Sequence, residues 1–231
     1  MCYIFPMKNT FSQFNKAFTL AEVLITLVII GVVAALAISP LINTYVESST
    51  VSKVKKGLSI LGQAKKLAEV QNGSIEGWEF DEGSTAETAT QFWNYLKPHI
   101  SVAKDCGTGT NCYINQSIKH LSGTNYSSLN ASNFYKVILP DGSMFLFRTG
   151  GFAGTGKCSV ADGNVKDVCA LFFYDVNGAK NPNTIGRDIF LFEFAKEGVY
   201  TYLTNDCINT NSLGYGCSSY IIKKSDMKYL H

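Results

Sequence analysis

Charge of either sign is scarce in this chain, and the two signs nearly cancel. Its 231 residues include 20 Lys and Arg against 18 Asp and Glu, which gives a formal net charge of +2. Two of the basic residues, Lys8 and Lys16, lie in the first 17 positions, so the remainder is close to neutral. Because a basic face is the usual footprint of a nucleic-acid-binding domain, we expect no nucleic-acid partner.

Histidine is equally scarce, and no enzyme motif accompanies the three that are present. His99, His120 and His231 adjoin neither a recognisable nucleophile nor a pair of carboxylates in the sequence. Residues 151–158, GFAGTGKC, come within one residue of a phosphate-binding loop, but Cys158 stands where a magnesium-binding Ser or Thr is needed. We therefore interpret this stretch as a Gly-rich hairpin extension and expect a protein that is not an enzyme and requires no cofactor.

The sequence also lacks the Cys-x2-Cys spacing that is typical of zinc sites. Of seven cysteines, Cys2 lies in the first 17 residues, and the other six fall into three neighbouring pairs. These pairs are Cys106 with Cys112, Cys158 with Cys169, and Cys207 with Cys217. An even set of cysteines in an oxidising compartment indicates disulfides, although the sequence leaves their connectivity open. We favour bonds between neighbouring cysteines.

No basic residue occurs between Lys16 and Lys53, and within this interval lies a long apolar run. Residues 18–38, FTLAEVLITLVIIGVVAALAI, are 21 residues with one charged side chain, Glu22. At about 1.5 Å per helical residue the run spans roughly 30 Å, which is one bilayer crossing. Lysines precede the run and do not follow it closely, so we expect a cytoplasmic N-terminus and an exported remainder.

Glu22 is costly in this position. A carboxylate near the bilayer centre costs roughly 2.5 to 3.5 kcal/mol on insertion scales, so we expect a partner for it. If the chain were cut between Ala17 and Phe18, the new α-amino group would lie one helical turn from Glu22. That cation could pair with the glutamate of the same chain or of a neighbouring copy.

Residues 16–24, KAFTLAEVL, resemble the cleavage and N-methylation motif of type IV pilins and type II secretion pseudopilins. The resemblance implies cleavage before Phe18 by a prepilin peptidase, methylation of the new amine, and a glutamate, Glu22, that meets a neighbour's N-terminus in a filament. It covers residues 16–40. The sequence departs from the family pattern in carrying Ala17 where glycine is usual before the cut, and in placing Pro40 one residue later than is common.

The apolar run continues as one stripe of a helix. Val51, Val54, Leu58, Leu61 and Leu67/Ala68 follow a three-four spacing that predicts a helix with one buried face. We expect Pro40 to bend this helix and Asn72-Gly73 to end it. Five lysines are predicted to lie mostly on its solvated flank, rather than to form a lipid-binding patch: Lys53, Lys55, Lys56, Lys65 and Lys66.

The remaining residues predict a small α+β domain. Ser84 to Glu87 form a capping-box pattern that begins a short helix, and residues 107–116 read as a loop. Strands are predicted over residues 134–140, 143–148, 168–174, 188–195 and 199–203, with Asp141-Gly142 as the tightest hairpin turn. Residues 218–230 fit either a helix or a strand. Alternating aromatic residues on these strands indicate core, with a carbohydrate-binding face as the lesser alternative.

These predictions combine into a pilin-like architecture. Residues 1–17 would be a leader, 18–40 a transmembrane and filament-core helix, 41–72 its amphipathic continuation, and 73–231 an exported globular domain. The long helix would pack on one antiparallel sheet with disulfide-closed loops.

A loop between two predicted strands carries the strongest metal-binding pattern. Residues 175–188, DVNGAKNPNTIGRD, gather Asp and Asn oxygens of the kind that calcium prefers, without the glycine spacing of an EF-hand. They resemble the Asp/Asn-rich calcium loop of major pseudopilins at Asp175, Asn177 and Asp188. A plain turn built from turn-favouring residues is the alternative.

We consider two functions on this basis. The first is a structural subunit of a type IV pilus-like or type II secretion filament, anchored in a bacterial inner membrane, with its exported domain in the periplasm or on the cell surface. Its partners would be other copies, related pilin-like subunits and the prepilin peptidase and methyltransferase. The second is a membrane-anchored binding module or adhesin that does not polymerise.

Overall fold

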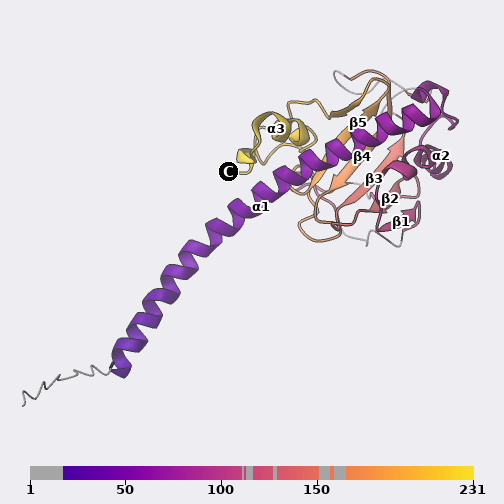
Figure 1. Cartoon of the computed structure of the whole chain (residues 1–231). Helices are drawn as coiled ribbons and strands as arrows, with labels where there is room; N and C mark the ends of the chain where they lie inside the picture. Colours follow the sequence, from indigo (N-terminus) through magenta and orange to yellow (C-terminus); the bar gives the residue numbers. More distant parts are fainter. Residues whose placement is uncertain (1–17, 111, 113–116, 127–128, 151–156, 159–164) are drawn as a thin grey trace, which may run out of the picture. The chain divides into compact units, whose positions relative to one another are not determined.

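The computed structural model describes residues 18–110, 112, 117–126, 129–150, 157–158 and 165–231 (Figure 1). The predicted leader, residues 1–17, and the Gly-rich stretch 151–156 lie outside this part of the chain. The chain divides into two compact units, one ending at Tyr45 and the other comprising Val46–His231. The long helix α1 (Leu20–Asn72) contributes to both, so its two parts are described separately.

The first part of α1 is apolar on all its described sides. Large hydrophobic side chains from Val23 to Val46 are exposed around the whole circumference. A helix that is hydrophobic all round belongs in a membrane or in a larger helical core. By length and composition α1 is suited to crossing a membrane. Backbone helix continues through residue 40, where the sequence predicts a bend.

The second part of α1 is amphipathic, as its spacing predicts. Val54, Leu61, Ala64 and Ala68 are fully buried on one stripe and belong to the main core. The helix ends where expected, because Gly73 follows Asn72 with a φ of +79°, the left-handed conformation that terminates helices with little strain.

Most of the five lysines lie where predicted, since Lys55, Lys56 and Lys66 are exposed, but Lys65 is buried. This side chain is only 4% exposed and pairs with Glu69 one turn further along. Its ammonium group also lies 6.0 Å from the ring centre of Phe194. Lys53 is half-buried and donates to the backbone carbonyl of Val176 at 2.7 Å. This hydrogen bond joins α1 to the end of β4.

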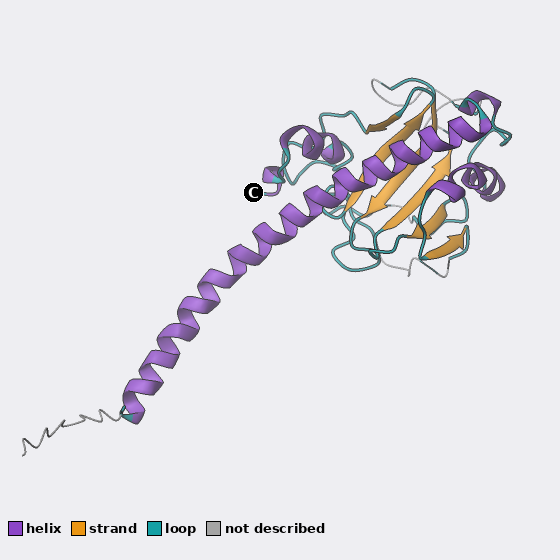
Figure 2. Ribbon diagram, in the orientation of Figure 1, coloured by secondary structure: helices purple, strands orange, loops and turns teal. Residues whose placement is uncertain are grey.

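Six strands of the described chain form one antiparallel sheet in sequence order (Figure 2). Their bounds are β1 (Lys104–Gly107), β2 (Tyr135–Ile138), β3 (Met144–Thr149), β4 (Val168–Asp175), β5 (Ile189–Ala195) and β6 (Val199–Thr201). The predicted β2–β3 hairpin is confirmed, with Gly142 at a φ of +82° in its turn. Every pair of neighbouring strands is therefore also consecutive along the chain.

Two strand predictions need correction. The sequence predicts a loop over residues 107–116 and no strand ahead of it. In the structure, Lys104–Gly107 forms β1, which pairs with β2 and shifts register between Asp105 and Gly107. Strand β6 ends at Thr201 rather than at residue 203. Both are short edge strands with exposed residues, and such segments carry little of the alternating pattern on which sequence prediction depends.

The sheet is covered on both faces, which explains why β4 and β5 are buried along their whole lengths. On one face, alternate aromatic residues of β3, β4 and β5 form the main core beneath α1 and α2 (Ala86–Leu96). Figure 2 shows the second part of α1 running across this face. The opposite face is covered by residues such as Ile118, Leu129 and Phe134. Because these rings are buried, the prediction that they form the hydrophobic core is confirmed. The aromatic residues of β3, β4 and β5 therefore do not form an exposed surface for binding carbohydrate.

Helix α2 begins one residue later than its sequence pattern indicates. The capping box is made by Thr85 and Thr88, not by Ser84 and Glu87. Thr88 donates its backbone N–H to the Thr85 hydroxyl at 3.1 Å, and the Thr85 N–H returns to the Thr88 hydroxyl at 3.0 Å. This one-residue shift buries Thr88, whose hydroxyl bonds Thr149 of β3 at 2.7 Å.

The end of the chain is helical. Helix α3 (Cys217–Lys224) is followed by a 3-10 turn (Lys228–Leu230), which resolves the ambiguous pattern of residues 218–230. Two further 3-10 turns, Ile75–Gly77 and Lys97–His99, flank α2.

All three disulfides predicted between neighbouring cysteines are present. They join Cys106 to Cys112, Cys158 to Cys169 and Cys207 to Cys217. Each closes a short loop, and on the chain-entropy account such loops stabilise a domain by about 2 to 3 kcal/mol.

Helix α1 lies close to the sheet at Gly57. A Cβ atom placed there would lie 2.7 Å from the ring of Tyr174 on β4. Glycine is therefore required for contact between this helix and the sheet, whereas Gly62, one and a half turns further on, has open space around it.

We predict opposite effects for alanine at these two glycines. Gly57→Ala should destabilise the protein by about 1 to 3 kcal/mol, because the added methyl group forces the helix or the ring to move. Gly62→Ala should stabilise it by roughly 0.5 to 1 kcal/mol through helix propensity. Urea unfolding of the detergent-solubilised chain measures both. Equal stability of the two variants would contradict the close approach.

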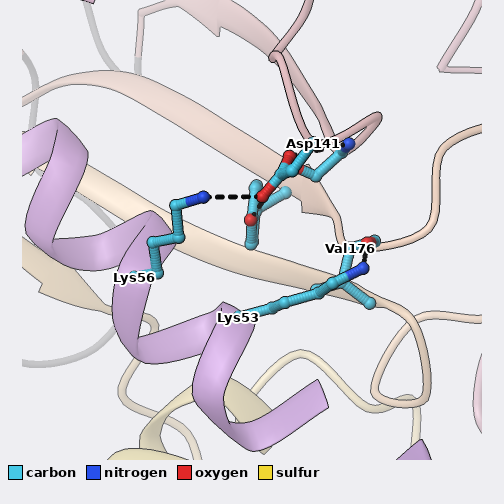
Figure 3. A network of polar contacts seen from close by, with 6 residues as sticks. Lys53, Lys56, Asp141 and Val176 are labelled. Carbon is cyan, nitrogen blue, oxygen red and sulfur yellow. Dashed lines mark hydrogen bonds and ion pairs between the residues drawn. The ribbon is translucent and has the colours of Figure 1, made fainter. Parts of the chain in front are cut away.

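A chain of polar contacts ties α1 to the β2–β3 turn (Figure 3). The Lys56 ammonium group pairs with Asp141 at 2.8 Å, and Asp141 accepts the Ser143 hydroxyl at 2.5 Å. Ser143 in turn accepts the hydroxyl of the buried Tyr174 at 3.1 Å. Burial alone would raise the pKa of Asp141, but hydrogen bonds from Lys56 and Ser143 outweigh it and lower the pKa to about 2.

We predict that this network makes stability dependent on acid. The folded-state pKa of Asp141 lies below the unfolded value of about 3.9, so its contribution is complete above that value and is lost as pH falls toward 2. The stability difference between wild type and Asp141→Asn should therefore shrink between pH 5 and pH 2. Unfolding midpoints measured across this range test it. Lys56→Met should reduce the same dependence, and a difference that stays constant with pH would contradict the assignment.

Candidate functional site

The start of α1 brings Thr19 and Glu22 together in a reciprocal capping box. The Glu22 backbone N–H donates to the Thr19 hydroxyl oxygen at 3.2 Å. In return, Glu22 Oε2 accepts the Thr19 backbone N–H at 2.9 Å and the Thr19 hydroxyl at 2.8 Å. Glu22 is thus bound within its own chain.

This arrangement has a simple physical cause. The first turn of a helix leaves backbone N–H groups without partners, and a Thr-x-x-Glu sequence satisfies two donors reciprocally. The negative charge also lies at the positive end of the helix dipole. Sequence reasoning missed this role of Thr19, although the spacing of Thr19 and Glu22 is the usual signature of the motif.

The predicted cleavage position lies beside this box. Ala17 is outside the described residues, and Phe18 is 85% exposed immediately before Thr19. The Thr19 nitrogen already contacts the Glu22 carboxylate, so an amine at Phe18 would be only one residue from it. Phe18 therefore lies on the surface of the first unit.

The apolar surface around this box is extensive. Beyond Glu22, the exposed large hydrophobic residues of the first unit are Val23, Leu24, Ile25, Leu27, Val28, Ile29, Ile30, Val32, Val33, Leu36, Ile38, Leu41, Ile42 and Tyr45. A patch of this extent on a protein marks contact with a membrane or with other protein chains.

The loop between β4 and β5 brings together the three predicted calcium ligands. Asp188 accepts the backbone N–H groups of Thr184 at 2.6 Å and Asn183 at 2.8 Å. It also accepts the Asn177 side-chain amide at 3.2 Å, and the Asn177 backbone N–H donates to Asp175 at 3.1 Å. Burial raises the pKa of Asp188, although these hydrogen bonds oppose the shift.

The carboxylate and amide oxygens in this loop are of the kind that a hard cation such as calcium binds. Asp175 and Asp188 are buried carboxylates, and the buried Oδ1 of Asn177 has no hydrogen-bond partner in the described part of the chain. No cluster of three or more His, Cys, Asp or Glu side chains that could hold a metal occurs among the described residues. An ion here would therefore need Asn177 and backbone oxygens as well as the two acids, and calcium binding stays a prediction.

Residues 13–38 match the family model described as the prokaryotic N-terminal methylation motif. This match, on a long apolar helix that is followed by a helix-covered antiparallel sheet, supports a type IV pilin-like protein. Residues 40–227 match the model of the "Family of unknown function (DUF6613)", and the chain belongs to that family. No curated protein and no solved structure matches the chain.

We predict that calcium, if it binds the 175–188 loop, raises the melting temperature of the protein. The measurement compares the detergent-solubilised chain in calcium, in magnesium and in EGTA. Asp188→Asn should abolish the calcium effect, because it removes one of the two buried carboxylates. An unchanged melting temperature of wild type in calcium and EGTA would show that the loop is a turn without a metal.

Proposed function

We propose that this protein is a structural subunit of a type IV pilus-like or type II secretion filament. A prepilin peptidase cuts it before Phe18, and the new amine is methylated. It resides in a bacterial inner membrane with its N-terminus in the cytoplasm and its globular domain exported. The observation that carries this proposal is the Glu22 carboxylate held at the start of an exposed apolar helix.

Assembly then requires Glu22 to change partners. Before assembly, the hydrogen bonds from Thr19 lower the cost of a carboxylate in the apolar layer, a cost of roughly 2.5 to 3.5 kcal/mol when it is unpaired. In the filament, the Phe18 amine of a neighbouring copy replaces them with an ion pair. A buried ion pair contributes more to register than to net stability, because desolvation offsets much of its attraction.

The apolar side chains of α1 supply the association itself. Without water between helices in a membrane, association depends on close packing and on interhelical polar contacts. The exposed residues between Val23 and Tyr45 provide the packing surface, and Glu22 provides the polar contact. Partners are other copies and related pilin-like subunits.

A non-polymerising, membrane-anchored binding module is the second candidate, and the cavity on the exported unit described below is the feature that favours it. The two candidates differ in the state of the N-terminus. Mass spectrometry of the native protein should show a chain that begins at methylated Phe18 if it is a filament subunit. A chain that keeps its first 17 residues would support the anchored module.

We predict that Glu22→Ala leaves the protein in the membrane fraction but removes it from sheared filaments. The apolar run is unchanged by this substitution, so insertion persists while the intermolecular pair is lost. Immunoblots of membrane and sheared fractions measure the two outcomes separately.

Thr19 provides the matched control for this experiment. Thr19→Ser keeps the hydroxyl of the capping box and should assemble as wild type does. Thr19→Val has nearly the same shape without the hydroxyl and should reduce the amount of assembled protein. Assembly of Glu22→Ala at the wild-type level would refute the role given to Glu22.

A further inference from the structure

A cavity of about 490 Å³ opens beside α3 in the exported unit. Its walls come from residues 204–208, from α3 and from the C-terminal 3-10 turn, with α3 labelled in Figure 1. Small-molecule sites commonly occupy 300 to 1,000 Å³, so the size suits a small ligand. Neither the predicted assembly site nor the 175–188 loop contributes to it.

The charge of this cavity is positive. Lys223 and Lys228 line it, and the lining residues in the described chain include no Asp or Glu. Lys223 makes no ion pair or hydrogen bond with any described residue, and Lys228 lies 3.9 Å from Asp226 with its side chain 82% exposed. Two ammonium groups therefore line the cavity, and one of them, that of Lys228, has an acid close by.

Two other acids lie near the cavity, and both have partners: Glu47 pairs with His231 at 2.8 Å, and Asp206 accepts three hydrogen bonds. Its Oδ1 accepts the Thr204 hydroxyl at 2.8 Å and the Gly216 N–H at 2.5 Å. Its Oδ2 accepts the Tyr215 N–H at 3.2 Å. These bonds fix the loop that enters α3 and hold the Asp206 carboxylate on that loop.

Ser219 adds a hydroxyl to the cavity. It lines the cavity from α3 and is only 5% exposed. The buried hydroxyl without a hydrogen-bond partner in this part of the described chain belongs to the neighbouring Ser218, which does not line the cavity. A hydroxyl in this position can donate to a bound acceptor.

The walls of the cavity are held rigidly. The Cys207–Cys217 disulfide joins the loop to the first residue of α3. Opposite it, Tyr229 donates its hydroxyl to the carbonyl of Gly186 at 2.6 Å and packs edge-on against Tyr220, with ring centres 5.0 Å apart. A site held in this way loses little conformational freedom on binding.

We propose that this cavity binds a small polar ligand that carries a phosphate or a carboxylate. Lys223 and Lys228 neutralise the anionic group, and Ser219 donates a hydrogen bond to it. Lysine ammonium groups bind phosphate as point charges, and charged hydrogen bonds are stronger than neutral ones. Thr204 and Asn205 at the edge of the cavity offer polar groups to the rest of the ligand. The site does not depend on filament assembly.

The test is titration of the detergent-solubilised full chain with glucose 6-phosphate, glucuronate and glucose, followed by calorimetry. Wild type should bind at least one of the two anionic probes, and the preferred probe distinguishes phosphate from carboxylate. Uncharged glucose should bind more weakly than that probe. Affinity should fall as salt is added, because the attraction is between charges.

Variants on one helix provide the control. The double variant Lys223→Ala/Lys228→Ala should weaken binding by about ten-fold or more, since charged hydrogen bonds are lost. Lys224→Ala removes the adjacent lysine of α3, which does not line the cavity, and should bind as wild type does. Ser219→Ala should weaken binding without changing the melting temperature. Absence of binding to both anions, or equal affinity in the double and Lys224→Ala variants, would overturn the proposal.

Discussion

One helix in this protein has to satisfy two surroundings, and this constraint organises the rest of the structure. The first part of α1 exposes apolar side chains around its circumference, whereas the second part confines them to a stripe that completes the core of the exported unit. The sheet has to supply a flat aromatic face for that stripe, and Gly57 has to be small enough to let helix and ring meet. Lys53 and Lys56 then tie the flanks of the same helix to the ends of the strands.

Periodic features of this fold could be predicted from the sequence, and aperiodic ones could not. The stripe of α1, the β2–β3 hairpin and the long central strands each repeat one pattern over several residues. Strand β1 and the end of β6 are too short and too exposed to carry such a pattern. Burial of Lys65 escaped prediction because a lysine inside a helix gives no sign that Glu69 and an aromatic ring will enclose its ammonium group.

The candidate sites show the same division. Glu22 could be singled out because a lone acid in an apolar run is costly, and the three disulfides followed from neighbouring cysteines. The Thr-x-x-Glu spacing of Thr19 and Glu22 carries the signature of the cap, but an acid in an apolar run equally indicates a cationic partner, so the sequence does not single out the local bond. The lysines and Ser219 of the α3 cavity are joined only by folding, since loop 204–208 and the end of the chain must close around the helix.

The order of the strands has a consequence for export. Each strand pairs with the strand that precedes it, and the disulfides join cysteines only 6, 11 and 10 residues apart. In the proposed topology the chain beyond the membrane segment crosses in sequence order, so it can add one hairpin at a time to α1 and oxidise each cysteine pair as soon as it is across. Such local connectivity favours rapid folding and shortens the period in which unpaired strand edges are open to aggregation. With this connectivity the second unit can pair its cysteines locally, without the exchange of mispaired cysteines that a long-range network would demand.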